Sequence, residues 1–204
     1  MSTAARFQPI SVRDYLDGER RAKRKHEYVD GVVYAMVGGT VTHSRIASNA
    51  TVALGMQLRG QRCQVFNSDI KIRAEQAGDT RFYYPDLSVV CQPNAPRDLY
   101  HDAPVVIVEV ISESTRRIDE YEKRQAYLAI DALCVYLLVE QTGAAVLVYR
   151  RRDIGFERET YTGLDNVIPL PEIGCTLPLS ELYENVEFPP PLSDEAADEG
   201  FQTN

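Results

Sequence analysis

A single carboxylate interrupts the most apolar stretch of this chain. Residues 104–112 read PVVIVEVIS, a continuous and largely β-branched run with the length of one strand. Such a run is typical of a strand that is buried on both faces in the middle of a sheet. Glu109 stands inside it, and an ionised carboxylate is costly to bury unless a cation or hydrogen-bond donors compensate its charge. The sequence therefore predicts a central strand with a compensating group bound at Glu109.

A second carboxylate belongs to a neighbouring predicted strand, FYYPDLSVVC at residues 82–91. Pro85 places Asp86 at the start or edge of that strand, because proline cannot donate to a sheet ladder. If Asp86 and Glu109 converge from adjacent strands, they form an oxygen-rich site suited to Mg²⁺ or Mn²⁺. The alternative is that Glu109 pairs with an arginine or a lysine and only organises the core. These two residues alone do not decide between a metal site and a core ion pair.

A helix capped by Ser114 or Thr115 is predicted to follow the strand of Glu109 and to run to about residue 130. Residues four apart lie on one face of a helix. Three residues with this spacing are Asp119, Lys123 and Tyr127. A lysine on that face can reach the carboxylate of the preceding strand, which favours a functional site over a core ion pair.

The remaining segments predict a mixed architecture. The other expected helices cover residues 11–18 with a cap at Ser11, residues 42–59, and a short stretch after Pro178. The other expected strands are a hairpin at 26–37 that turns at Asp30-Gly31, and single strands at 63–74, 133–140, 144–150 and 155–162. This order predicts an α/β (α+β) fold, in which helices flank a mixed and largely antiparallel central sheet.

The length and composition predict one domain. The chain has 204 residues, of which 44% are apolar, enough to bury one substantial core. We expect this domain at residues 1–183, and a disordered acidic tail at 184–204, which is rich in proline and then in acidic residues. No apolar run is long enough to span a membrane, and the first residues lack the apolar core of a signal peptide. We therefore expect a cytoplasmic protein with no membrane partner.

The net charge of -8 and the pI of about 5.0 weigh against non-specific attachment to nucleic acid. Two basic clusters stand against this background, RRAKRK at 20–25 and YRRRD at 149–153. On the sequence alone, each cluster is better interpreted as a solvated face than as a DNA groove.

Four cysteines lie far apart in the chain, without the close pairs that a zinc site requires. They are Cys63, Cys91, Cys134 and Cys175. Because cysteine is among the most often buried residue types, we expect all four to be buried free thiols, which fits a reducing compartment. We expect His26 and His101, which belong to no motif, to be exposed.

Taken together, several segments resemble a known family. The segments are YPDLSVV, PVVIVEVISEST, DEYEKRQAYLAI and CVYLLVE, with HEYVDGVVYAM and THSRI upstream. They resemble the Uma-type restriction endonuclease family of the PD-(D/E)xK phosphodiesterase superfamily, and the resemblance covers roughly residues 10–183. It implies a restriction-endonuclease-like fold and hydrolysis of phosphodiester bonds that depends on a divalent metal ion.

The resemblance also implies roles for individual residues. Asp86 and Glu109 would hold Mg²⁺ or Mn²⁺, with the Val110 carbonyl as a further ligand. The superfamily usually carries its lysine two residues after the glutamate, where this chain has Ile111. The resemblance therefore implies a migrated lysine, and the candidate is Lys123.

Four further residues receive weaker assignments. Glu27 would be an additional acid near the metal, and His43 stands at a family-like position. The alternatives are an exposed glutamate at a strand end and a histidine with an ordinary structural hydrogen bond. Asp119 and Tyr127 would position Lys123; otherwise Asp119 is a first-turn residue favoured by the helix dipole, and Tyr127 is simply half-buried.

The expected function is metal-dependent endonucleolytic cleavage of DNA by a homodimer, since nucleases that cut both strands commonly need two sites. The strands after residue 133 and the polar strand near 156–162 are the expected dimer surface. Two alternatives remain: a nuclease-fold module that has lost catalysis and serves as a binding or assembly partner, and an enzyme that hydrolyses small phosphate esters.

Overall fold

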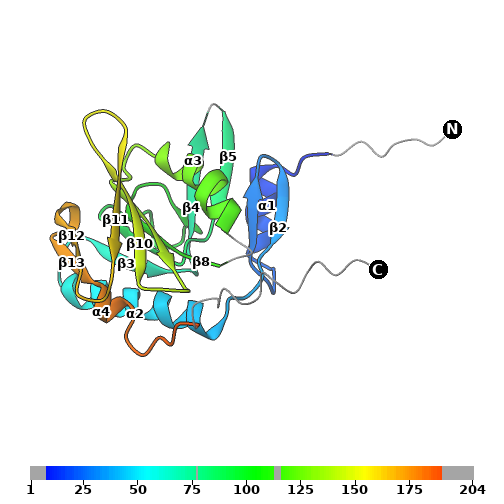
Figure 1. The fold of residues 1–204 in the computed structure, drawn as a ribbon. Helices are drawn as coiled ribbons and strands as arrows, with labels where there is room; N and C mark the ends of the chain where they lie inside the picture. Colours follow the sequence, from blue (N-terminus) through cyan, green and yellow to red (C-terminus); the bar gives the residue numbers. More distant parts are fainter. Residues whose placement is uncertain (1–7, 77, 113–115, 190–204) are drawn as a thin grey trace, which may run out of the picture.

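The apolar run around Glu109 forms β8 (Pro104–Ile111), which lies inside a six-stranded sheet (Figure 1). In this computed structural model, which describes residues 8–76, 78–112 and 116–189, the strand order is β11-β10-β9-β8-β6-β3. All of β8 is buried except the half-buried Val105, so the predicted central strand is confirmed. The other strands are β3 (Gln64–Asn67), β6 (Leu87–Val90), β9 (Val135–Glu140), β10 (Ala145–Arg151) and β11 (Phe156–Thr162).

A second sheet has five strands in the order β2-β1-β5-β4-β7. Its strands are β1 (His26–Val29), β2 (Val32–Ala35), β4 (Lys71–Gln76), β5 (Asp79–Tyr83) and β7 (Tyr100–His101). The predicted hairpin is confirmed: β1 and β2 turn at Asp30 and Gly31, whose φ angles of 48° and 90° are the positive values that such a turn requires.

Two predicted strands were wrong, because each is divided between the two sheets. The segment 63–74 becomes β3 and β4, which are separated by a turn in which the Asn67 side chain accepts a hydrogen bond from the Asp69 amide at 3.0 Å. The segment 82–91 becomes β5 and β6, and the chain passes from one sheet to the other at Tyr84, Pro85 and Asp86. Asp86 therefore lies at the junction of the two sheets.

Helices cover both faces of the six-stranded sheet, as predicted. They are α2 (Val41–Gln57), the π-helical η1 (Ile118–Lys123), α3 (Arg124–Leu128) and α4 (Leu179–Leu182). The remaining helix, α1 (Val12–Glu19), packs on the five-stranded sheet, where its Tyr15 shares a core with Tyr28 and Phe82. Ile46 and Leu54 of α2 share a core with Val108, whereas Ile107 and Tyr127 belong to the core on the opposite face. Figure 1 shows α2 and α4 together on one side of the sheet, with α3 on the other.

The remaining helix details follow the sequence in part. The Ser11 side chain accepts a hydrogen bond from the Asp14 amide and so caps α1, as predicted. The predicted caps of the helix after β8 lie in 113–115, outside the described residues. A hairpin of β12 (Val167–Leu170) and β13 (Cys175–Pro178), joined by the 3-10 turn η2 (Pro171–Ile173), was not predicted. Within the described residues, no helix combines the length and the apolarity needed to cross a membrane.

The described residues end at 189, so most of the predicted tail lies outside them. The domain boundary at residue 183 therefore stays a prediction.

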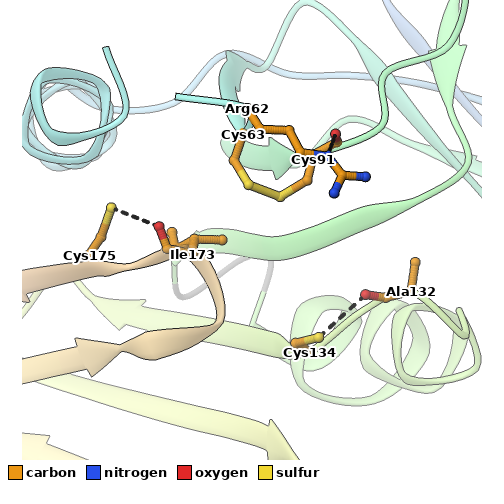
Figure 2. The surroundings of a disulfide bond; sticks show 7 residues. All are labelled: Arg62, Cys63, Cys91, Ala132, Cys134, Ile173 and Cys175. Atoms are coloured by element: carbon orange, nitrogen blue, oxygen red, sulfur yellow. Dashed lines mark hydrogen bonds between the residues drawn. A yellow bond between two sulfur atoms is a disulfide. The ribbon is translucent and has the colours of Figure 1, made fainter. Parts of the chain in front are cut away.

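The prediction of four free thiols was wrong. Cys63 and Cys91 form a disulfide, and Figure 2 shows it beside Arg62, whose side chain donates to the Cys91 carbonyl at 3.2 Å. The antiparallel register pairs Gln64 with Val90, so the residues just outside this pair lie opposite each other. Cys134 and Cys175 are free. Because two of the four cysteines form a disulfide, the cysteines no longer support the expectation of a reducing compartment.

The prediction of two exposed histidines was also wrong. His101 is 6% exposed, and its Nδ1 accepts a hydrogen bond from the Asn94 amide at 3.1 Å. His26 is half-buried, with its Nδ1 2.7 Å from Glu19 Oε1. Burial lowers the pKa of His101 below its ordinary value of 6.5, because the charged imidazolium loses solvation.

The lowered pKa of His101 predicts a specific acid sensitivity. As the pH falls below about 6.5, the unfolded state takes up this proton before the folded state does, so the free energy of unfolding decreases. In His101→Asn this contribution is absent. Between pH 7 and pH 5.5 the free energy of unfolding of the variant should therefore fall less steeply than that of wild type, by at most about 1.4 kcal/mol per pH unit. Urea titrations at the two pH values measure it, and equal slopes for both proteins would contradict it.

Candidate active site

Asp86 and Glu109 lie close together at the start of β6, beside β8. The register pairs Leu87 with Val108, so Asp86, one residue before Leu87, falls beside Glu109. Leu87 and Val108 belong to the core under α2, and successive strand residues point to opposite faces. Asp86 and Glu109 both line one cavity of about 850 Å³. The two carboxylates therefore border the same space.

Asp86 is held in place by two hydrogen bonds. One carboxylate oxygen lies 2.8 Å from Nε2 of His43, and the other accepts the backbone N–H of Val110 at 2.7 Å. Because β6 begins only at Leu87, the Val110 amide lies beyond the part of β8 that pairs with β6, and the Asp86 side chain replaces a backbone partner there. The N–H and C=O of one strand residue point to the same side of the strand, so the Val110 carbonyl also faces the Asp86 side.

Glu109 is 4% exposed and accepts hydrogen bonds from two side chains of the following helix. The Tyr127 hydroxyl lies 3.1 Å and the Lys123 ammonium 3.3 Å from the same carboxylate oxygen. Burial raises the pKa of Glu109 well above its ordinary value, and the charge of Lys123 opposes this only in part. Glu109 therefore has a lysine and a tyrosine as partners.

Lys123 joins the two sheets through its ion pairs. Its Nζ lies 3.1 Å from a carboxylate oxygen of Glu27 in β1 and 3.4 Å from one of Asp119, in addition to its contact with Glu109 in β8. Burial alone lowers the pKa of Lys123, but the surrounding carboxylates outweigh this effect and hold it well above its usual value. The lysine stays charged although it is 7% exposed.

The site contains more negative than positive charge. The side chains of its four acids are 15%, 16%, 5% and 4% exposed, in the order Glu27, Asp86, Glu109 and Asp119. Lys123 supplies one positive charge, and His43, whose pKa is raised by its hydrogen bond to Asp86, can supply a second. Even with His43 protonated, the four carboxylates exceed the two cations when all are ionised. Such a surplus in a buried site favours a further cation.

The donor set fits a hard divalent cation with few protein ligands. Among the described residues, no group of three or more His, Cys, Asp or Glu side chains is arranged as a metal cluster. Asp86, Glu109 and Val110, however, border one cavity, and two carboxylates, a carbonyl and retained waters are a ligand set that suits Mg²⁺. The residues present therefore fit the ion that the sequence implies.

Comparison with known proteins gives the family. The model of the Uma2 family, described as "Putative restriction endonuclease", matches residues 12–180. The chain belongs to the Uma2 family. An uncharacterized protein of Synechocystis sp., slr1290, is 33% identical over 92% of this chain and 98% of its own length. A second one, sll1609, is 26% identical over 69% of this chain and 80% of its own length.

A solved structure confirms the fold class. The crystal structure of a "putative nuclease belonging to DUF820" from Anabaena variabilis has a TM-score of 0.63 and 18% sequence identity, covering 82% of this chain and 96% of that chain. At this identity the likeness shows the fold alone. The predicted restriction-endonuclease-like α+β architecture and the family resemblance are thus both confirmed.

The helix after β8 presents its three predicted side chains to the site of this Uma2 chain. Asp119, Lys123 and Tyr127 are all buried. The first two lie in the π-helical η1, whose wider turn leaves backbone carbonyls without their usual helical donor. The Tyr136 hydroxyl donates to the Asp119 carbonyl at 3.1 Å and stabilises this turn. The four-residue spacing predicted the shared face, but no sequence signal indicated the π-helical geometry.

Sequence analysis missed two residues that shape the Uma2 site. Tyr84 lines the cavity, and its backbone N–H donates to Glu27 at 3.3 Å, which fixes that acid beside Lys123. Its position before Pro85 was the available signal. The second residue is Gly39: a Cβ there would lie 2.8 Å from Cδ2 of His43, so this glycine makes room for the imidazole ring.

Proposed function

We propose that this protein is a divalent-metal-dependent endonuclease that hydrolyses phosphodiester bonds in DNA. The observation that carries the proposal is the convergence of three carboxylates on Lys123, with Asp86 lining the cavity beside them and a surplus of negative charge. A core ion pair needs one acid for one base, whereas this cluster has acids to spare. The family description of Uma2 supports the same class of reaction.

In this proposal Asp86, Glu109 and the Val110 carbonyl hold Mg²⁺ or Mn²⁺. The bound ion supplies Lewis-acid polarisation of the phosphate and lowers the pKa of a water molecule. His43 keeps the Asp86 carboxylate in one orientation through the 2.8 Å contact. Tyr127 does the same for Glu109 through the bond from its hydroxyl at 3.1 Å.

Lys123 is the proposed catalytic cation. Its ammonium carries three hydrogens, so it can orient the attacking water or donate to a phosphate oxygen on which negative charge develops. Glu27 and Asp119 position the ammonium, because both carboxylates lie within 3.4 Å of Nζ. The superfamily usually carries its lysine two residues after the glutamate, where this chain has Ile111. In this assignment Lys123 on the helix supplies that positive charge instead.

The proposal also includes DNA as the substrate and a homodimeric state of the protein. β11 is one of the two edge strands of the six-stranded sheet, so among the described residues no strand pairs with its outer edge, where a second copy can bind. The earlier expectation that the strand after residue 133 also contributes was wrong for β9, because that strand lies between β8 and β10 and its residues Val135–Val139 are buried.

The direct test uses supercoiled plasmid. We expect the purified protein to nick or linearise it with Mg²⁺ or Mn²⁺ and to leave it intact in EDTA. Asp86→Asn removes a ligand charge but keeps the shape of the side chain, and we expect it to lower the cleavage rate at least about a hundredfold through loss of metal affinity. Equal cleavage by wild type and Asp86→Asn would reject the proposed site.

One observation favours the catalytically lapsed alternative: the Lys123 ammonium is already surrounded by three carboxylates. Calorimetric titration with Mn²⁺ separates the alternatives, because a lapsed site should show no binding that depends on Asp86. A small phosphate ester as the true substrate would be revealed by hydrolysis of a chromogenic diester without cleavage of plasmid.

A further inference from the structure

The loop between α1 and β1 carries the densest positive charge of the chain. Five of its six residues are basic, namely Arg20, Arg21, Lys23, Arg24 and Lys25. Two of them, Arg24 and Lys25, line the same cavity as Asp86, Glu109 and Lys123. The sequence alone favoured a solvated face for this cluster, but the structure places its end at the wall of the candidate active site.

The backbone of this basic segment is anchored at both ends. At its start, the Arg21 N–H donates to the Gly18 carbonyl at 3.0 Å. At its end, the Lys25 ammonium donates to the Ser68 carbonyl at 2.8 Å and to the Asp69 carboxylate at 2.5 Å. The Lys25 carbonyl also accepts a hydrogen bond from Met36 at 3.0 Å. These contacts fix the segment against the turn between β3 and β4.

The charges of the other four residues are not neutralised. Arg20, Arg21, Lys23 and Arg24 are exposed, and no carboxylate of residues 8–76, 78–112 or 116–189 forms an ion pair with them. In a protein with a net charge of -8, such a local excess of positive charge attracts polyanions to this side of the cavity.

The second basic cluster of the sequence behaves differently. Arg150 is 4% exposed and pairs with Glu159 and Glu172, and Arg152 pairs with Glu157 and Glu159. Arg151 donates to the backbone carbonyls of Leu133 and Ile130. The arginines of this second cluster therefore make contacts within the fold, and none of them borders the cavity.

We propose that the segment 20–25 binds the phosphodiester backbone of the nucleic-acid substrate, which rests on the proposed function. Arg24, at the cavity wall, contacts a phosphate next to the scissile one. Arg20, Arg21 and Lys23 extend the contact along the strand outside the cavity, while Lys25 holds the segment in place. The segment supplies affinity and direction without reading bases, because backbone contacts carry no direct sequence information.

The test measures binding without cleavage. Fluorescence anisotropy with a fluorescein-labelled DNA oligonucleotide, single-stranded or duplex, is recorded in EDTA over a range of salt concentrations. The variant is Arg21→Gln, Lys23→Gln, Arg24→Gln. The control is Arg59→Gln, Arg97→Gln, Arg158→Gln, which removes the same charge from exposed positions away from the cavity.

Each phosphate contact contributes about 0.9 for a duplex, or about 0.7 for a single strand, to the slope of log K against log salt. We expect the segment variant to lower that slope by about 2 and to weaken binding at least about tenfold at low salt, while the control stays near wild type. An equal loss in both variants means that only net charge matters and overturns the inference.

The same proteins separate this inference from the proposed function. If wild type cuts plasmid but the segment variant binds DNA as well as the control does, the segment assignment fails and the nuclease stands. If binding depends on the segment but no metal supports cleavage, the nuclease fails and the contact surface stands. Segment-dependent binding to phosphatidylserine vesicles, with unchanged DNA binding, would assign the segment to a membrane and overturn the inference.

Discussion

Glu109→Gln is expected to abolish metal-dependent cleavage while leaving the protein as stable as wild type or more stable. Glutamine keeps the shape of the side chain and an oxygen that accepts from Tyr127, but it cannot supply the charge that a divalent ion requires. A loss of about 4 kcal/mol of charge stabilisation corresponds to roughly a thousandfold in rate. The folded protein loses only a carboxylate whose pKa is already raised by burial.

Stability measurements on Glu109→Gln separate the functional site from a core ion pair. If Glu109 served only as the partner of Lys123, removing its charge would break a buried pair and cost about 3 to 5 kcal/mol. In the metal-site interpretation, Glu27 and Asp119 continue to neutralise the lysine, so the melting temperature does not fall. Mn²⁺ should raise the melting temperature of wild type and not that of the variant. A large loss of stability together with retained cleavage would reject the site.

Lys123→Met is expected to have the largest effect on stability. The lysine contacts three buried carboxylates, and its removal leaves them facing one another without that charge. Breaking a buried ion pair on one side costs about 3 to 5 kcal/mol, and cleavage should be lost as well. Mn²⁺ should restore much of this stability, because the ion replaces the missing positive charge.

Urea denaturation with and without Mn²⁺ measures this effect, and Lys25→Met is the matched control. Lys25 is 39% exposed and pairs with Asp69 at the surface, so its replacement should change stability by less than about 1 kcal/mol. If Lys123→Met folds only when Mn²⁺ is added, that rescue supports the charge balance proposed for the site. A variant that matches wild type in stability and is indifferent to Mn²⁺ would contradict it.

The sequence predicted the central strand and the common helix face of the residues that follow it because both depend on local patterns. A long apolar run around Glu109 has few places in a fold other than the middle of a sheet. The four-residue spacing of Asp119, Lys123 and Tyr127 fixes their common face wherever the helix packs. The roles of these residues stay predictions, because their position near Glu109 does not show what reaction they carry out.

What the sequence did not predict depends on which distant segments pair. Residues 63–74 alternate imperfectly and residues 82–91 have the composition of a strand, and neither pattern shows that its segment leaves one sheet and enters another. The disulfide follows from the pairing of β3 with β6, which only the tertiary structure brings about. His101 is buried because β7 pairs with β4, and a two-residue strand leaves no periodic signal.

The position of Lys123 across the two sheets makes the geometry of the cluster sensitive to distant changes. Glu27 belongs to the five-stranded sheet and Glu109 to the six-stranded sheet, and the ammonium group touches both. A substitution in either core that rotates one sheet by a few degrees therefore alters the spacing of the acids without replacing any of them. Variants selected for altered turnover can then arise far from the cavity, among residues whose only property is their packing volume.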